Sequence, residues 1–158
     1  MENKKTAVVY YTLQGYTEKL AYKIAEITNA DLYKIELVKP YTILSSYTLG
    51  ILHARRGVCP EIKNKIQNLD SYDTIFIGAP VWAFMLTPPI NTFLKENNLA
   101  MKNVVPFCTH KGNFGSYFKN FKEKLPNSII SKYADFHNNT IVNEERVKEF
   151  IKESFDLK

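Results

Sequence analysis

AVVYYTLQGYT, residues 7–17, is the stretch from which the fold of this chain can be inferred. Its apolar first half predicts a buried β-strand, and the glycine-bearing, hydroxyl-rich turn that follows leads into a sequence with helical periodicity. A phosphate at such a turn would meet backbone N–H groups, the hydroxyls of Thr12 and Thr17, and the positive end of the helix dipole. The stretch therefore predicts a strand, an anion-binding loop and a helix in succession.

The next two segments continue this alternation. Apolar residues at helical spacing predict a helix over residues 16–28, which ends at Asn29. Residues 31–38 mix apolar and polar side chains, which is typical of an edge strand half open to water, and Pro40 terminates that strand. The sequence thus begins as a strand-helix-strand unit.

Residues 41–70 carry weaker signals. Residues 47–56 predict a short helix that ends at Gly57. A second helix is predicted after Pro60 from three apolar residues at helical spacing: Ile62, Ile66 and Leu69.

The second half of the chain returns to clear patterns. DTIFIG, residues 73–78, has its apolar residues in one unbroken run and predicts a strand buried on both faces. A loop over 79–87 follows, and Thr87 before two prolines starts a helix. A further strand is predicted over 103–107, although a proline inside a central strand is unusual. A loop is predicted over 108–115, followed by a helix that stops at Pro126 and whose buried face consists of Phe114, Phe118, Phe121 and Leu125. A strand is then predicted over 128–136. The final helix is capped by Asn143, and its inward-facing residues are Val147, Phe150 and Ile151.

Strands and helices that alternate in this way predict an α/β fold, in which helices cover both faces of a doubly wound, five-stranded parallel sheet. The order 2-1-3-4-5 would bring the loops after strands 1, 3 and 4 together at the carboxyl edge of the sheet. We expect residues 1–158 to form a single domain, since chains of this length usually do.

Composition narrows the range of partners. The net charge of +5 is spread over helical patterns in which lysine alternates with glutamate, so we expect no nucleic-acid partner. The apolar run near the N-terminus is too short for a signal peptide or a membrane span. Two cysteines without CxxC or paired-histidine spacing predict no disulfide framework and no metal site, and a reducing cytoplasm fits best.

The carboxyl edge of such a sheet can hold several kinds of ligand, and the loops discriminate among them. A phosphate-binding NTPase requires GxxxxGK[ST], and a dinucleotide fold requires GxGxxG after the first strand; the first loop has neither. A receiver domain requires acidic residues at the ends of strands 1 and 3, where this chain has Tyr11-Thr12 and Gly78-Ala79. A mononucleotide with a flat ring is the remaining ligand.

The chain resembles the flavodoxin family, and more particularly its short flavodoxin-like branch of FMN-binding proteins. Nearly the whole length is covered, and three motifs carry the resemblance: TLQGYT (12–17), GAPVWAFMLTPPINTFL (78–94) and PFCTHKGNFGS (106–116). The first resembles the [ST]-x-T-G-x-T phosphate loop of the family, from which it departs at Gln14 and Tyr16. The second resembles its G-x-P-x-W loop, and the third resembles its T-H-x-G loop.

The resemblance implies a non-covalently bound FMN, with the first loop on the phosphate and the other two on either side of the ring. It assigns cofactor contact to seventeen residues of the three loops, and it assigns no catalytic residue and no metal ligand. The expected contacts are Thr12, Leu13, Gln14, Gly15, Tyr16, Thr17, Pro80, Val81, Trp82, Ala83, Phe84, Thr109, His110, Lys111, Gly112, Phe114 and Gly115.

Several of these residues also have a plainer interpretation. Trp82 could be a core residue, and the two threonines could serve only as helix caps. His110 could contact the flavin or be an ordinary hydrogen-bonded loop residue, and the sequence leaves both open. His53 and His137 are expected to be structural or exposed, and Cys108 is expected to be a small buried side chain rather than a nucleophile.

Two functions fit an FMN protein of this kind. One is a flavin enzyme that takes electrons from NAD(P)H and reduces a quinone or similar acceptor; the other is a one-electron carrier between protein partners, supplied by a reductase. Carriers of the family are strongly acidic, whereas the loops expected at the ring carry Lys111 and His110 and no acidic residue, which favours full two-electron reduction. A flavin-free scaffold is a third possibility. The acceptor and the choice between monomer and homodimer stay open.

Overall fold

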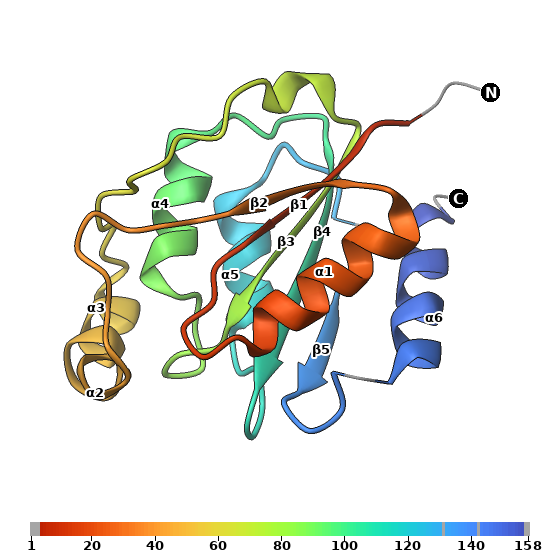
Figure 1. The fold of residues 1–158 in the computed structure, drawn as a ribbon. Coiled ribbons are helices and arrows are strands. Elements are labelled where there is room, and N and C mark those ends of the chain that lie inside the picture. Colours follow the sequence, from red (N-terminus) through yellow and green to blue (C-terminus); the bar gives the residue numbers. More distant parts are fainter. Residues whose placement is uncertain (1–3, 131, 142, 157–158) are drawn as a thin grey trace.

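The computed structural model describes residues 4–130, 132–141 and 143–156. Five parallel strands form one sheet in the order β2-β1-β3-β4-β5, which confirms the predicted topology. The strands are β1 (Thr6–Tyr10), β2 (Asp31–Lys34), β3 (Thr74–Pro80), β4 (Asn103–His110) and β5 (Ala134–His137). Figure 1 shows α1 (Tyr16–Thr28) and α6 (Glu144–Phe155) on one face of the sheet, with α4 (Pro88–Glu96) and α5 (Tyr117–Lys124) on the other.

Two apolar cores follow from the alternation of side chains along the buried strands. Val8, Phe76 and Val105 are aligned across β1, β3 and β4 and pack with α1 and α6. Their chain neighbours point the other way and pack with α4 and α5. Because β1 and β3 are buried on both faces, polar side chains occur only at the ends of these strands.

Helix boundaries follow the local signals. Helix α1 has the predicted bounds, and Asn29 ends it in the left-handed conformation, with its N–H bonded to the carbonyl of Ala25. Thr87 precedes Pro88 at the start of α4, and the Asn143 side chain accepts a hydrogen bond from the Arg146 N–H at the start of α6. Among the described residues, no helix is both long and apolar enough to cross a bilayer.

Strand β2 is shorter than predicted, and no α-helix forms around Ile62, Ile66 and Leu69 in the described structure, where only a short 3-10 helix (Leu69–Ser71) is present. The sheet pairing of β2 ends at Lys34 rather than at residue 38, and Leu37 instead forms an antiparallel bridge with Ile62. The side-chain amide of Asn64 donates to the Lys34 carbonyl (2.7 Å), and its oxygen accepts from the Glu36 N–H (2.9 Å). These contacts tie residues 62–64 to the departing chain, so the apolar spacing there belongs to an irregular segment that packs against the core.

Residues 43–56 form a continuous helical segment that begins earlier than the predicted residue 47. It consists of α2 (Ile43–Ser45), a π-helical turn (Ser46–Gly50) and α3 (Ile51–Arg56). Thr42 and Ser45 form a capping box at its start. Gly57 ends it at φ 63°, as predicted.

Strand β4 extends to His110, so the loop predicted to start at Cys108 is shorter than expected. Pro106 is tolerated inside this central strand because of its register. The N–H of Val104 points toward the β5 side of the strand, where it donates to the Ile129 carbonyl. Backbone N–H groups point alternately to the two sides of a strand, so the nitrogen of Pro106 also faces the β5 side. Pairing with β5 begins only at Phe107. The missing N–H of the proline therefore costs no ladder bond to β5.

The last predicted boundaries also shift. Helix α5 begins at Tyr117, so Phe114 lies in the loop before it, while Phe118 and Phe121 are buried as expected. Strand β5 covers only Ala134–His137, because residues 128–130 contact the sheet through one bridge, between Asn103 and Ile129. Residue 131 of the predicted strand lies outside the described residues.

Gly78 is expected to be essential for packing within β3. A methyl group at this position would overlap the ring of Phe107 on the neighbouring strand, so we expect Gly78→Ala to lower the free energy of unfolding by about 2 kcal/mol. Urea denaturation followed by circular dichroism measures the change. Gly112→Ala, which adds a methyl group with no heavy atom within 4 Å, is the control, and equal stability of the two variants would contradict the prediction.

Candidate functional site

A cavity of about 500 Å³ opens at the carboxyl edge of the sheet, where the loops after β1, β3 and β4 meet. Every predicted contact residue lines it except Gly15, Phe114 and Gly115. Sequence reasoning missed five further lining residues: Ser46, Tyr47, Ile51, Asn113 and Asn138. The first three come from the helical segment over 43–56, which Figure 1 shows beside this edge. The weak patterns of that segment gave no signal that it would reach the site.

The first loop presents the start of α1 to the cavity. Gly15 has a φ of 90°, which favours glycine, and no side chain caps the helix. Thr12 Oγ1 accepts a hydrogen bond from the Gly15 N–H (3.0 Å), which fixes the turn and leaves the threonine O–H free to donate. The N–H groups of the first helical turn have no intrahelical partner, so this end of the cavity suits an anion.

Glu18, in the first turn of α1, would oppose an anion if its charge were free. Lys34 Nζ lies 2.9 Å from its carboxylate and the hydroxyl of Tyr10 donates to it (2.8 Å). The hydrogen bond from Lys34, followed by that from Tyr10, lowers the pKa of Glu18 below its usual range. The carboxylate is therefore charged but locally compensated, and the positive end of the helix is preserved.

A buried contact between hydroxyls ties the first loop to the third. Thr17 Oγ1 and Thr109 Oγ1 lie 2.7 Å apart, and both residues are almost completely buried. Because Thr17 lies in the first turn of α1 and Thr109 near the end of β4, this bond fixes the distance between the anion-binding end and the rest of the cavity.

Trp82 lies in the second loop and forms part of the cavity wall, where it packs on the core at the same time. Its ring meets Tyr11 and Tyr41 edge to face, with centroids 5.9 and 5.1 Å apart. Tyr41 is in turn held by a 2.6 Å hydrogen bond between its hydroxyl and His53 Nδ1, so His53 has the structural role that was expected. Trp82 is therefore both a core residue and part of the cavity wall, because one side of its ring packs on the core and the other side faces the cavity.

The turn after Trp82 is strained. Ala83 and Phe84 adopt φ values of 51° and 62°, which side chains rarely occupy, and Trp82 and Met85 exchange backbone hydrogen bonds across the turn. Gly115 lies directly against Phe84, where a Cβ would clash, and the Ser116 N–H donates to the Phe84 carbonyl (2.8 Å). Gly115 therefore supports the cavity wall from outside, although it was expected to contact the ligand.

The end of β4 contributes His110, whose side chain is only 7% exposed. Its Nε2 lies 2.9 Å from Asp135 Oδ2, whereas its Nδ1 is buried and has no partner among the described residues. Asn138 Oδ1 is likewise buried without a partner and belongs to the same wall. Cys108 is fully buried, and burial raises the pKa of its thiol well above the usual value, so it is a packing residue and not a nucleophile.

The cavity lining carries no acidic side chain among the described residues, and Lys111 is its one permanent cation. Nor do the described histidine, cysteine, aspartate and glutamate side chains form a cluster that could hold a metal ion. The site combines an anion-binding end, an aromatic wall and two unsatisfied polar atoms. Such an arrangement can hold a phosphorylated ligand with a flat polar ring.

Comparison with known proteins gives a consistent result. The sequence model described as Flavodoxin matches residues 5–155. A putative flavoprotein from Bacteroides uniformis is 29% identical, with a TM-score of 0.81 over 94% of this chain and 98% of its own. A Lactobacillus acidophilus flavoprotein, solved in complex with FMN, is 27% identical, with a TM-score of 0.72 over 93% of this chain and 98% of its own.

A flavodoxin from Megasphaera elsdenii shares the fold, with a TM-score of 0.63 at 16% identity over 94% of this chain and 97% of its own. No curated protein matches the chain.

Gly50 leaves room for the Trp82 ring. A Cβ at Gly50 would lie 2.9 Å from Cζ3 and 3.1 Å from Cε3 of Trp82. Because the backbone of Gly50 is right-handed helical (φ −62°), Gly50→Ala should be tolerated by the helix but should push the indole toward the cavity. We expect the emission of this single tryptophan to shift to longer wavelength, whereas Thr48→Ala, an exposed change in the same turn, leaves it unchanged. Identical spectra for the two variants would show that Gly50 does not set the position of the ring.

Proposed function

The chain belongs to the flavodoxin family, and from this premise we propose that it is an FMN-dependent reductase, which passes electrons from NAD(P)H to a quinone or a similar acceptor. FMN is the cofactor of the cavity. The cavity volume of about 500 Å³ falls in the range of small-molecule sites, about 300–1,000 Å³. The unsatisfied His110 Nδ1 and Asn138 Oδ1 give a polar ring two atoms to meet.

The two ends of the cavity would bind different parts of FMN. The N–H groups of the first turn of α1, together with the hydroxyl of Thr12, would hold the phosphate. Trp82 and the third loop would enclose the ring. When bound, FMN supplies one- and two-electron chemistry that amino-acid side chains lack, and the protein orients it and sets the charge around it.

The lining without acidic side chains is the observation that favours the reductase over the carrier. Two-electron reduction places negative charge on the flavin, and a nearby carboxylate would oppose that charge in a partly buried site. The described lining carries Lys111 and otherwise neutral groups. Two carboxylates close to it are already paired, because Glu18 bonds to Lys34 and Asp135 faces His110 and Arg146. We also place the protein in the cytoplasm, which is supported by the free thiol of the exposed Cys59.

Mixing the purified protein with a reduced nicotinamide cofactor tests the reaction. We expect acid to release FMN from the protein, and NADH or NADPH to bleach the bound flavin rapidly under anaerobic conditions. Failure to bleach, together with a half-reduced flavin that is stable over a wide range of potential, would indicate the one-electron carrier. A protein that binds no flavin at all would reject both functions.

Trp82→Ala tests the binding site itself. Loss of the aromatic wall should weaken FMN binding by about 10-fold or more, because aromatic contacts with a buried ring contribute about 1 kcal/mol beyond their area. Titration of flavin fluorescence measures the affinity. Tyr22→Ala removes an exposed ring from α1 outside the cavity and is the matched control. Equal affinities for the two variants would place the ring elsewhere.

A further inference from the structure

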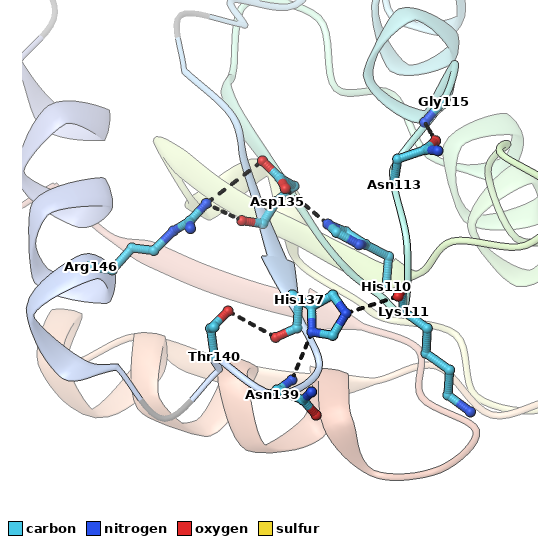
Figure 2. Close-up of polar contacts among 9 residues, drawn as sticks. All are labelled: His110, Lys111, Asn113, Gly115, Asp135, His137, Asn139, Thr140 and Arg146. Atoms are coloured by element: carbon cyan, nitrogen blue, oxygen red, sulfur yellow. Dashed lines mark hydrogen bonds and ion pairs between the residues drawn. The ribbon is translucent and has the colours of Figure 1, made fainter.

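The ends of β4 and β5 bring together a polar cluster in which His110 of the third motif meets two residues outside the motifs, Asp135 and His137. His110 pairs with His137 and Cys108 with Asp135 in the parallel register of the two strands. Because side chains alternate along a strand, His110, Asp135 and His137 emerge on the same face of the sheet. Figure 2 shows His110 with Asp135 on one side and the ring of His137 on another.

Asp135 determines which nitrogen of His110 carries a proton. An ionised carboxylate only accepts hydrogen bonds, so the 2.9 Å contact between Asp135 Oδ2 and His110 Nε2 requires a proton on Nε2. Arg146 holds the aspartate from the opposite side. Its guanidinium donates to the Asp135 carbonyl (2.6 Å) and lies 3.7 Å from Oδ1, as Figure 2 shows.

His137 is occupied elsewhere and cannot take the place of Asp135. Its Nδ1 accepts from the Asn139 N–H (3.2 Å), so its Nε2 carries the proton that is donated to the Lys111 carbonyl (2.9 Å). Its ring meets that of His110 edge to face, with centroids 5.7 Å apart. His137 therefore fixes the third loop and restricts the His110 ring without bonding to either of its nitrogens.

His110 Nδ1 is left as the one unsatisfied atom of this cluster. It is buried, it belongs to a residue that lines the cavity, and no described residue bonds to it. With the proton held on Nε2, the Nδ1 of the neutral ring is an acceptor, and so is the nearby unsatisfied Asn138 Oδ1. A buried acceptor without a partner is unfavourable, so this wall is complementary to a ligand that carries N–H or O–H donors.

We propose that Asp135 is a positioning residue for the cofactor, which by accepting the Nε2 proton of His110 presents the bare Nδ1 to a ring N–H of the bound flavin. This assignment rests on the proposed function. The oxidised flavin ring has one such N–H between its two carbonyl groups, and His110 Nδ1 would accept its hydrogen bond. Asp135 itself need not touch the cofactor, because His110 lies between them.

Asp135→Asn is the decisive variant, because an amide can donate as well as accept and no longer dictates the proton position on His110. We expect FMN and riboflavin, which lacks the phosphate, both to bind about 10-fold more weakly, as for loss of one buried hydrogen bond. A purely electrostatic role predicts the opposite for FMN. Removing a negative charge would strengthen binding of the anionic FMN and leave neutral riboflavin unchanged, and that result would overturn the proposal.

Glu145→Gln is the matched control, since it removes one negative charge beside Arg146 from a residue without hydrogen bonds or ion pairs to the described side chains. It should leave both affinities unchanged. In a His110→Asn background, Asp135→Asn should have no further effect. An undiminished effect in that background would show that Asp135 does not act through His110.

Nitrogen NMR of the FMN-loaded protein gives a readout independent of activity and affinity. We expect the wild-type His110 to carry its proton on Nε2 with a hydrogen-bonded Nδ1, and Asp135→Asn to populate both tautomers. The same tautomer and affinity in wild type and Asp135→Asn would overturn the assignment but leave the proposed function intact. A wild-type protein that binds no flavin would overturn both.

Discussion

Burial of the central strands on both faces is the constraint on which the rest of this structure depends. Ala7, Val8 and Val9 of β1 and Ile75, Phe76 and Ile77 of β3 have no solvent exposure, so neither strand can carry polar side chains along that length. Parallel strands all end at the same edge, and the polar groups of the chain accumulate there. The site forms at this edge because the central strands are closed to water along the rest of their length.

Most polar groups at that edge form hydrogen bonds or ion pairs with one another, and a few specific atoms have no partner. Thr12 braces Gly15, Thr17 bonds to Thr109, and Lys34 compensates Glu18. What stays unsatisfied is the start of α1 at one end of the cavity and His110 Nδ1 with Asn138 Oδ1 in its wall. Since buried polar atoms are normally paired, these exceptions mark the places where a ligand completes the structure.

Local signals predicted the elements that are stabilised locally. Asn29 and Gly57 end helices because they adopt the left-handed conformation, and Thr87 with its prolines starts α4. Prediction failed where a contact distant in sequence decides the conformation. Asn64 ties residues 62–64 to the chain leaving β2, and this overrides the helical spacing of Ile62, Ile66 and Leu69.

The sequence by itself determined the strand order, the family and the three loops that form the cavity, because each rests on periodicity, turn chemistry or motifs that are contiguous in the chain. Only the tertiary structure decided that the 43–56 segment forms part of the cavity wall, that Gly15 and Gly115 lie outside the cavity lining, and that Asp135 meets His110. Asp135 and His110 are 25 residues apart, and only the register of β4 against β5 brings the carboxylate to the imidazole. That register cannot be predicted from any contiguous stretch of the sequence, because it is set by how whole strands pack.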